Sequence, residues 1–244
     1  MTSTATAAGS APASKNLLAR IVGIVVSPKE TFQSVVASPK WFGVLATTTL
    51  AAAIFTALPL TTEAGRQSQI DRQVTQMQSF GFQVTDEMYQ RMEQGANRMP
   101  YMTAGSIVVI SPIVGAIFAG ILFAIFNAAL GGEASYKQVF TVGAHAAVIS
   151  VLGAVFTGLV GYFRQRMDSI TNLGSLLPML PEKSFAANLL GAIDIFIIWW
   201  MIVLAIGLGV LYRRRTQPIA FTLLGVYAVI AIVIAVFKSR AGGA

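Results

Sequence analysis

The sequence from Ser184 to Tyr212, which reads LLGAIDIFIIWWMIVLAIGLGVLY from Leu189 onward, decides the fold class. It carries one formal charge, Asp194, within a run of apolar residues. An α-helix rises 1.5 Å per residue, so about 20 apolar residues cross a hydrocarbon core of about 30 Å. The stretch is therefore predicted to span a membrane over about residues 187–211.

The composition of the whole chain also indicates a membrane protein. Hydrophobic residues make up 55% of the 244 residues and charged residues only 11%, about half the charged fraction of an ordinary globular protein. The net charge of +7 comes from basic residues that mostly flank apolar segments. This pattern predicts contact with lipid head groups, not with nucleic acid. The absence of cysteine excludes disulfides, Cys-ligated zinc and thiol catalysis.

Four further apolar segments predict an all-α polytopic membrane protein with five transmembrane helices. Residues 99–132 are uncharged and are too long for one perpendicular span but too short for two, so we expect one tilted helix that Pro112 bends. The expected spans are residues 41–62, 104–130, 139–162, 187–211 and 217–237.

The segments outside these spans differ in composition. Residues 1–14 are small and uncharged, which predicts a disordered tail, and residues 238–244 form a second short tail. Residues 15–40 predict two short amphipathic helices, which either lie in the membrane interface or pack under the bundle. Residues 63–98 predict an extramembrane helical hairpin between the first two spans, with Thr85 as a helix cap. The hairpin is interpreted as a lid on the bundle in preference to a partner surface.

The orientation in the membrane follows from the arginine cluster Arg213–Arg215. A total count of Lys and Arg does not distinguish the two sides, but this cluster directly joins two predicted spans. Short basic loops stay in the cytoplasm. We therefore expect the N-terminus inside and the C-terminus outside.

Asp194 is the main candidate for a functional residue. A carboxylate deep in a membrane costs about 2.5 to 3.5 kcal/mol and usually faces protein or water. Arg164 and Arg166 end the third predicted span on the same outer side, and long arginine side chains reach inward along apolar surface. We expect Asp194 to pair with one of them, or with Asn188, as a latch between helices. The alternative is a role in an ion or proton path.

Other candidates for chemistry are few. His145 is the single histidine, and its depth in the third span separates it from Asp194 by roughly 10 Å or more. A buried neutral histidine bonded to a backbone carbonyl is the favoured interpretation. Trp199 is interpreted as a packing residue. No protease, zinc, phosphate-loop or dinucleotide motif is present, so we expect no enzyme activity, cofactor or metal.

Three passages give the sequence a family resemblance. They are Arg20–Trp41 with SPKETF and PKW, Asn127–Val142 with GGEASYKQVF, and Leu190–Gly207 with DIF. Together they resemble the bacterial branch of the Yip (Ypt-interacting protein) domain family of five-span membrane proteins, over about residues 17–237. Asn127, Glu133 and Tyr136 of the second passage join the candidate residues on this ground.

The resemblance implies a cytoplasmic N-terminus and, for bacterial members, an integral membrane protein without a defined biochemical role. In eukaryotic relatives the family implies vesicle-trafficking partners that include Rab-type GTPases, but the short N-terminal region of this chain does not favour GTPase binding. We expect a scaffold or membrane-organising protein of a bacterial cytoplasmic membrane. Its expected partners are the lipid bilayer, other membrane proteins or a second copy. The alternative is a small transporter or channel-like protein that uses Asp194.

Overall fold

The protein is built from helices. A computed structural model describes residues 16–167, 170–177, 179–181 and 184–241. The α-helices of this part of the chain are α1 (Leu17–Val26), α2 (Pro28–Ala37), α3 (Phe42–Ala57), α4 (Glu63–Ser79), α5 (Asp86–Gly95), α6 (Met99–Phe123), α7 (Tyr136–Arg164), α8 (Phe185–Gly191), α9 (Ile195–Leu211) and α10 (Thr216–Ala241). Shorter helical turns are η1 (Leu58–Thr61), η2 (Ala96–Arg98), η4 (Leu173–Leu176) and the π-helical η3 (Ala124–Ala129).

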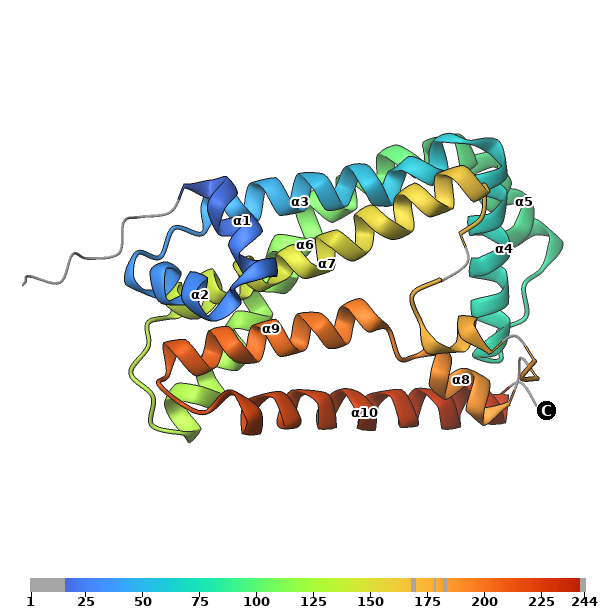
Figure 1. Cartoon of the computed structure of the whole chain (residues 1–244). Coiled ribbons are helices and arrows are strands. Elements are labelled where there is room, and N and C mark those ends of the chain that lie inside the picture. The colour runs from blue at the N-terminus through green and yellow to red at the C-terminus, as the bar shows by residue number, and fades with distance from the viewer. Residues whose placement is uncertain (1–15, 168–169, 178, 182–183, 242–244) are drawn as a thin grey trace, which may run out of the picture.

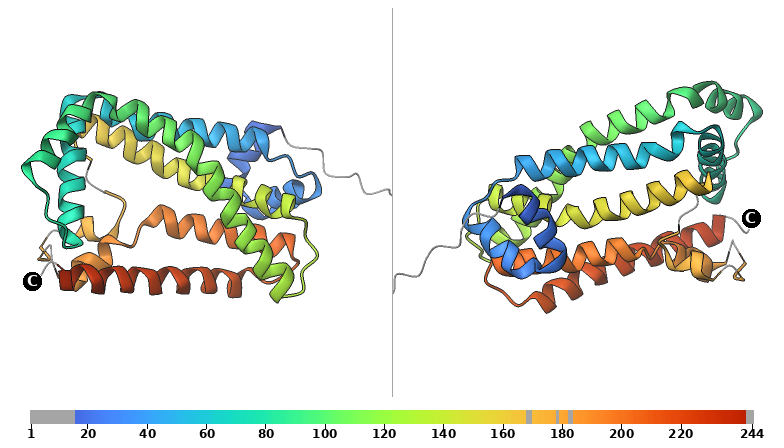
Figure 2. Two further views of the ribbon diagram at one scale, coloured as in Figure 1. Left: turned by 180° about the vertical axis from the view of Figure 1, so that it is seen from behind. Right: turned by 45° about the horizontal axis from the view of Figure 1, so that its top comes forward.

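Long helices form a bundle that the shorter ones close at its ends. Helix α7 packs against α3 on one side and α9 on the other, and α10 packs against α9 (Figure 1). Helix α6 packs against α3 and α7 and crosses the bundle obliquely (Figure 2). Helices α4 and α5 lie at one end of the bundle, and α1 and α2 lie at the other (Figure 1).

Four helical stretches of the described chain are long and apolar enough to cross a membrane. They are Phe42–Thr61, Asp86–Ala129, Tyr136–Arg164 and Thr216–Arg240. These stretches confirm the all-α, multi-pass prediction at this level. The second one includes the polar helix α5, and its apolar part is α6 with η3. Pro112 lies inside α6, where it cannot donate a hydrogen bond to the carbonyl four residues earlier.

The prediction of one continuous span over residues 187–211 is wrong. The chain leaves the helix after Gly191 and begins a new one at Ile195, so that the segment is divided into α8 with 7 residues and α9 with 17. The physical reason is Asp194, whose side chain caps the first turn of α9. A short acidic side chain favours a helix start over a helix interior, because it competes for backbone N–H groups.

Helices α1 and α2 pack under the bundle. Ile24 of α1 and both Phe32 and Val35 of α2 are fully buried, and α2 packs against α9 and α7. Gly207 of α9 makes this close approach possible, because a Cβ at that position would lie 2.9 Å from the ring of Phe32. The sequence left open whether residues 15–40 lie in the membrane interface or pack under the bundle. The inner faces of α1 and α2 pack under the bundle.

Helices α4 and α5 form a hairpin over the far end of the bundle. Arg72 of α4 donates a hydrogen bond to the Met167 carbonyl (3.0 Å), and the Met167 N–H donates to Ser68 (2.8 Å). The ring of Phe80 lies 5.7 Å from that of Phe237 in α10. Helix α5 has no buried residue, so α4 is the layer that touches the bundle.

The chain ends bear on two further predictions. The tail predicted for residues 1–14 lies outside the described residues. Residues 238–241, which were expected to begin a second tail, continue α10.

Helices α3 and α7 approach closely at Gly158. A Cβ at this position would lie 2.0 Å from the Phe55 carbonyl oxygen and 2.8 Å from its carbon. Because the obstacle is backbone, no side-chain rotation would relieve the contact. Small residues allow such close approach between membrane helices, where dispersion contacts replace the hydrophobic effect as the driving force.

We predict that Gly158→Ala lowers the stability of the bundle by about 1–3 kcal/mol, because α3 and α7 must separate to admit the methyl group. The matched control is Gly143→Ala in the same helix, where a Cβ would meet no atom within 4 Å. Thermal unfolding in detergent measures both variants. Equal melting temperatures for the two would contradict the packing described here.

Candidate functional site

Asp194 lies in the break between α8 and α9, and its carboxylate bonds both the start of α9 and a nearby loop. One carboxylate oxygen accepts hydrogen bonds from the backbone N–H groups of Phe196 (2.8 Å) and Ile197 (3.2 Å). The other accepts a short hydrogen bond from the hydroxyl of Thr171, a residue that is 5% exposed. Both oxygens are thus engaged at the start of an apolar helix, where the helix dipole also favours a negative charge.

The backbone around Asp194 is held from two further directions. The loop before η4 pairs with it like a short piece of antiparallel sheet, with Leu173 N–H bonded to Ile193 O (2.9 Å) and Ile195 N–H bonded to Thr171 O (3.1 Å). Tyr227 of α10 donates its hydroxyl to the Ala192 carbonyl (2.6 Å) and accepts from the Asp194 N–H (3.1 Å). The break between α8 and α9 is therefore tied to both the loop and α10.

The structure does not bring Asp194 to the arginines expected to pair with it. Arg164 and Arg166 are both exposed, and no ion pair joins either of them to Asp194 in the described chain. Asn188 instead donates to the Ser184 carbonyl within α8 (3.1 Å). The expected pairing is wrong because Asp194 starts a helix and takes its donors from the backbone and from Thr171. Asp194 thereby joins the start of α9 to the loop that contains Thr171.

A second polar site lies at the opposite end of α9. The side chain of Asn127, in the π-helical turn η3, donates to the Ala134 carbonyl (2.6 Å) and accepts from the Tyr212 hydroxyl (2.8 Å). The Tyr212 ring stacks on Phe126 at 4.7 Å. Burial raises the pKa of Tyr212, so this phenol stays protonated and remains a donor at neutral pH.

The turn after η3 is fitted to this site by its glycines. Gly131 has a φ of +66°, a conformation that favours glycine. A Cβ on Gly132 would lie 2.5 Å from the Tyr212 ring. Arg214 closes the site by donating to the Leu130 carbonyl (2.6 Å). The site joins the end of α6 to the α9–α10 connection.

Tyr136 and Glu133 lie next to this second site but serve different neighbours. The Tyr136 hydroxyl donates to the Ala116 carbonyl of α6 (2.9 Å), and its ring stacks on Phe140 at 6.2 Å. Glu133 is exposed in the turn. Tyr136 thus fastens the start of α7 to α6, whereas Glu133 faces outward.

His145 is fully buried in α7. Its Nδ1 lies 2.8 Å from the Thr141 carbonyl, and because a carbonyl only accepts, Nδ1 carries the proton. The backbone bond is the arrangement expected from the sequence. Nε2 has no hydrogen-bond partner among the described residues, and those residues contain no group of three or more side chains that could hold a metal ion.

The tryptophans of α9 lie near its start. Trp199 is 36% exposed and stacks on Phe196 at 6.2 Å, while the ring of Trp200 lies 5.5 Å from that of Phe118 in α6. Their placement early in α9, and not in the middle of a longer span, follows from the break at Asp194.

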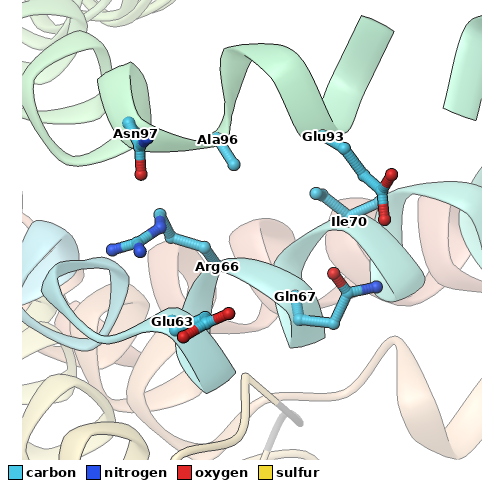
Figure 3. Close-up of a pocket in the computed structure, with 7 residues that line it drawn as sticks. All are labelled: Glu63, Arg66, Gln67, Ile70, Glu93, Ala96 and Asn97. Carbon is cyan, nitrogen blue, oxygen red and sulfur yellow. The ribbon is translucent and has the colours of Figure 1, made fainter. Parts of the chain in front are cut away.

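A polar pocket of about 220 Å³ lies between the hairpin helices (Figure 3). Its lining comes from α4 and from the α5–η2 region and consists of Glu63, Arg66, Gln67, Ile70, Glu93, Ala96 and Asn97. Arg66 donates to the carbonyls of Leu60 (3.3 Å) and Thr61 (3.1 Å). The arginine therefore ties α4 to the end of the first span as well as lining the pocket.

Comparison with known proteins identifies the family. The model of the Yip1 domain matches residues 22–237. The chain belongs to the Yip1 domain family. It is 28% identical over 178 residues to the membrane protein YknW of Bacillus subtilis (strain 168), an alignment that covers 68% of this chain and 76% of that protein. No solved structure matches the chain.

Family membership confirms the resemblance seen in the three sequence passages, and the Yip1 match covers all the candidate residues. The passages contribute to both polar sites of this Yip1-domain protein. Asn127 and the two glycines belong to the site at one end of α9, and Asp194 belongs to the site at the other.

Sequence reasoning missed the partners that complete these sites. Tyr227 is a polar residue within an apolar helix, and that signal could have identified it. Tyr212 directly precedes the arginine cluster, and nothing in this local sequence indicates its hydrogen bond to Asn127. Thr171 lies in a loop whose sequence has no motif or hydrophobic periodicity. Only the fold therefore reveals its contact with Asp194.

We predict that Tyr227→Phe destabilises this Yip1-domain protein by about 0.5–2 kcal/mol, because the Ala192 carbonyl and the Asp194 N–H lose their partner. Thermal unfolding in detergent measures the loss. Tyr101→Phe is the control, since Tyr101 is 80% exposed and should leave the melting temperature unchanged. A Tyr227→Phe protein as stable as the wild type would show that the hydroxyl does not hold the break.

Proposed function

We propose that this Yip1-domain protein is a non-enzymatic membrane scaffold with five spans that holds partner proteins or organises the bilayer around it. The proposal rests on the hydrogen bonds that the Asp194 carboxylate makes. This carboxylate, the one acidic group within the apolar α8–α9 segment, is occupied with a helix cap and a threonine hydroxyl. This use is structural and favours a fixed bundle.

The fifth span of the proposal is α9. With 17 residues it is about 26 Å long, which is at the lower limit for crossing a hydrocarbon core. It packs against α7 and α10, two of the four long apolar stretches. We place α8 and the break at one membrane surface and the Tyr212 end of α9 at the other.

The transporter alternative requires a carboxylate that exchanges its partners. An ion or proton path needs an acidic group that faces water or a mobile ligand for part of a cycle. Asp194 instead bonds two backbone N–H groups of its own helix. Releasing them would uncap α9. This constraint favours the scaffold.

Surfaces for partners are present on α6 and α10. Most of their exposed large side chains are apolar, and these include Val109, Ile113, Ile117 and Ile121 on α6 and Val226, Val229, Ile230 and Val233 on α10. A Cβ added at Gly115 or Gly225 would meet nothing within 4 Å. Lipid, a second copy or other membrane proteins fit such faces, because close-packed membrane interfaces use small residues beside large apolar ones.

The proposed location is a bacterial cytoplasmic membrane, with the N-terminus inside and the C-terminus outside. The arginine cluster Arg213–Arg215 supports this orientation, since it is exposed and directly joins α9 to α10. GTPase binding is not part of the proposal.

Two substitutions at Asp194 separate the scaffold from the transporter. Asn keeps an oxygen that caps a helix, whereas Ala removes the cap at a cost of about 1–2 kcal/mol. We predict that Asp194→Asn has a melting temperature close to that of the wild type and the same assembly size on native gels. Asp194→Ala should have a lower melting temperature and should lose the wild-type assembly size. Ion flux into proteoliposomes is expected to be absent in all three proteins. Flux in the wild type that Asp194→Asn abolishes would replace the scaffold with the transporter.

The topology can be tested because the chain contains no cysteine. We predict that a single cysteine at Arg215 reacts with a membrane-impermeant maleimide only after the cells are opened. A cysteine at Gln94, on the exposed helix α5, should react in intact cells. The reverse pattern would invert the orientation, and reaction of both positions on one side would contradict the five-span arrangement.

A further inference from the structure

Helix α1 has an unusual distribution of polar and apolar side chains. Its inner face buries Arg20, which is 3% exposed, beside the fully buried Ile24. Its outer face carries Leu18, Val22 and Val26 at intervals of four residues, and these are 70%, 52% and 76% exposed. The helix has only 10 residues and is too short to span a bilayer. An apolar outer face on such a helix fits the membrane interface.

Aromatic side chains lie at the same end of the bundle. Trp41 precedes α3, and its ring lies 5.4 Å from that of Phe140, which in turn stacks on Tyr136 at 6.2 Å. Helix α1 reaches this level, because Leu17 lies within 3.5 Å of the position that a Cβ on Gly43 would occupy. Aromatic residues of this kind gather at the head-group level of a membrane. This arrangement predicts that α1 lies at the depth where lipid head groups meet the acyl chains.

Positive charge surrounds the same end. Cations come from α2, from the starts of α3 and α7, and from the α9–α10 connection, which all lie at the same end of the bundle as α1 (Figure 1). The exposed ones are Lys29, Lys40, Lys137, Arg213, Arg214 and Arg215, and the exposed carboxylates of these segments are Glu30 and Glu133. Such an excess of cations at the head-group level attracts anionic lipid.

We propose that α1 inserts its Leu18, Val22 and Val26 face into one leaflet and that the surrounding cations select anionic phospholipid there. The occupant of this surface is a leaflet rich in a lipid such as phosphatidylglycerol. Arg214 has an internal role as well, since it donates to the Leu130 carbonyl, so the other five cations provide the exchangeable contacts. The inference goes beyond the scaffold role. It holds whether or not α9 crosses the membrane.

The first test places a probe on the apolar face. Because the chain has no cysteine, Leu18→Cys can carry one environment-sensitive fluorophore in the full-length protein. The protein is reconstituted into vesicles of phosphatidylcholine and phosphatidylglycerol that contain a lipid spin-labelled near its head group. We expect strong quenching at position 18. Gln94→Cys, on α5 at the other end, is the control and should remain unquenched. Equal, weak quenching at both positions would overturn the proposal.

The second test measures lipid selectivity. The spin label is carried either by phosphatidylglycerol or by phosphatidylcholine at the same mole fraction, and the ratio of the two quenching constants at position 18 is compared. We expect a ratio above about two at low salt, which falls toward one at high salt because ions screen exposed charges. A ratio of one at low salt would overturn the selection of anionic lipid.

The charge dependence has a matched pair of variants. Lys29→Gln, Lys40→Gln, Lys137→Gln and Arg215→Gln combined in one protein should bring the ratio close to one. Arg91→Gln with Arg98→Gln, two exposed positions at the hairpin, should leave it unchanged. The salt dependence of the Leu18→Cys protein, in which all six cations remain, gives the same answer if the fourfold variant fails to fold. An unchanged ratio in a folded fourfold variant would contradict the proposal.

Discussion

The hydrogen-bonding requirement of a backbone in hydrocarbon governs this fold. A bilayer core offers no water to an open N–H or C=O group, so a helix that ends at the edge of that core is stable where other groups replace its missing bonds. Between α8 and α9 the chain makes such a stop. Asp194 takes up the first N–H groups of α9, Thr171 and its neighbours pair with the backbone, and Tyr227 bonds the Ala192 carbonyl. The break is stable because three separate elements supply what the helix gives up.

The second polar site meets the same requirement at the other end of α9. There the helix geometry of α6 widens into the π-helical turn η3, and Asn127 bridges the Ala134 carbonyl and Tyr212. Each site connects a helix end to another element through one half-buried side chain. Asn127 both donates and accepts, and Asp194 accepts from several donors. Polar residues in this bundle thus hold its ends, while glycines such as Gly158 and Gly207 set how closely the helices pack.

The sequence predicted the helical class, the apolar segments and the family, because these depend on composition, periodicity and short motifs. It also predicted the Thr85 cap, and the structure has the Met88 N–H bonded to the Thr85 hydroxyl. It failed at Asp194. Charge alone suggested an arginine partner, whereas the local competition between carboxylate and backbone favoured a helix start. The partners of Asp194 come from positions 23 and 33 residues away in the chain, and such contacts have no local signature.

The position of α2 has a consequence for the order in which the molecule is made. Phe32 is fully buried and seated on Gly207 of α9, so the second helix of the chain cannot complete its packing until the ninth has left the ribosome. Membrane insertion proceeds from the N-terminus, and the first helices must wait at the membrane surface while the later ones enter. The outer apolar face of α1 allows these first helices to bind the membrane interface until α9 is inserted. Closure of the bundle is thus a late event that follows insertion.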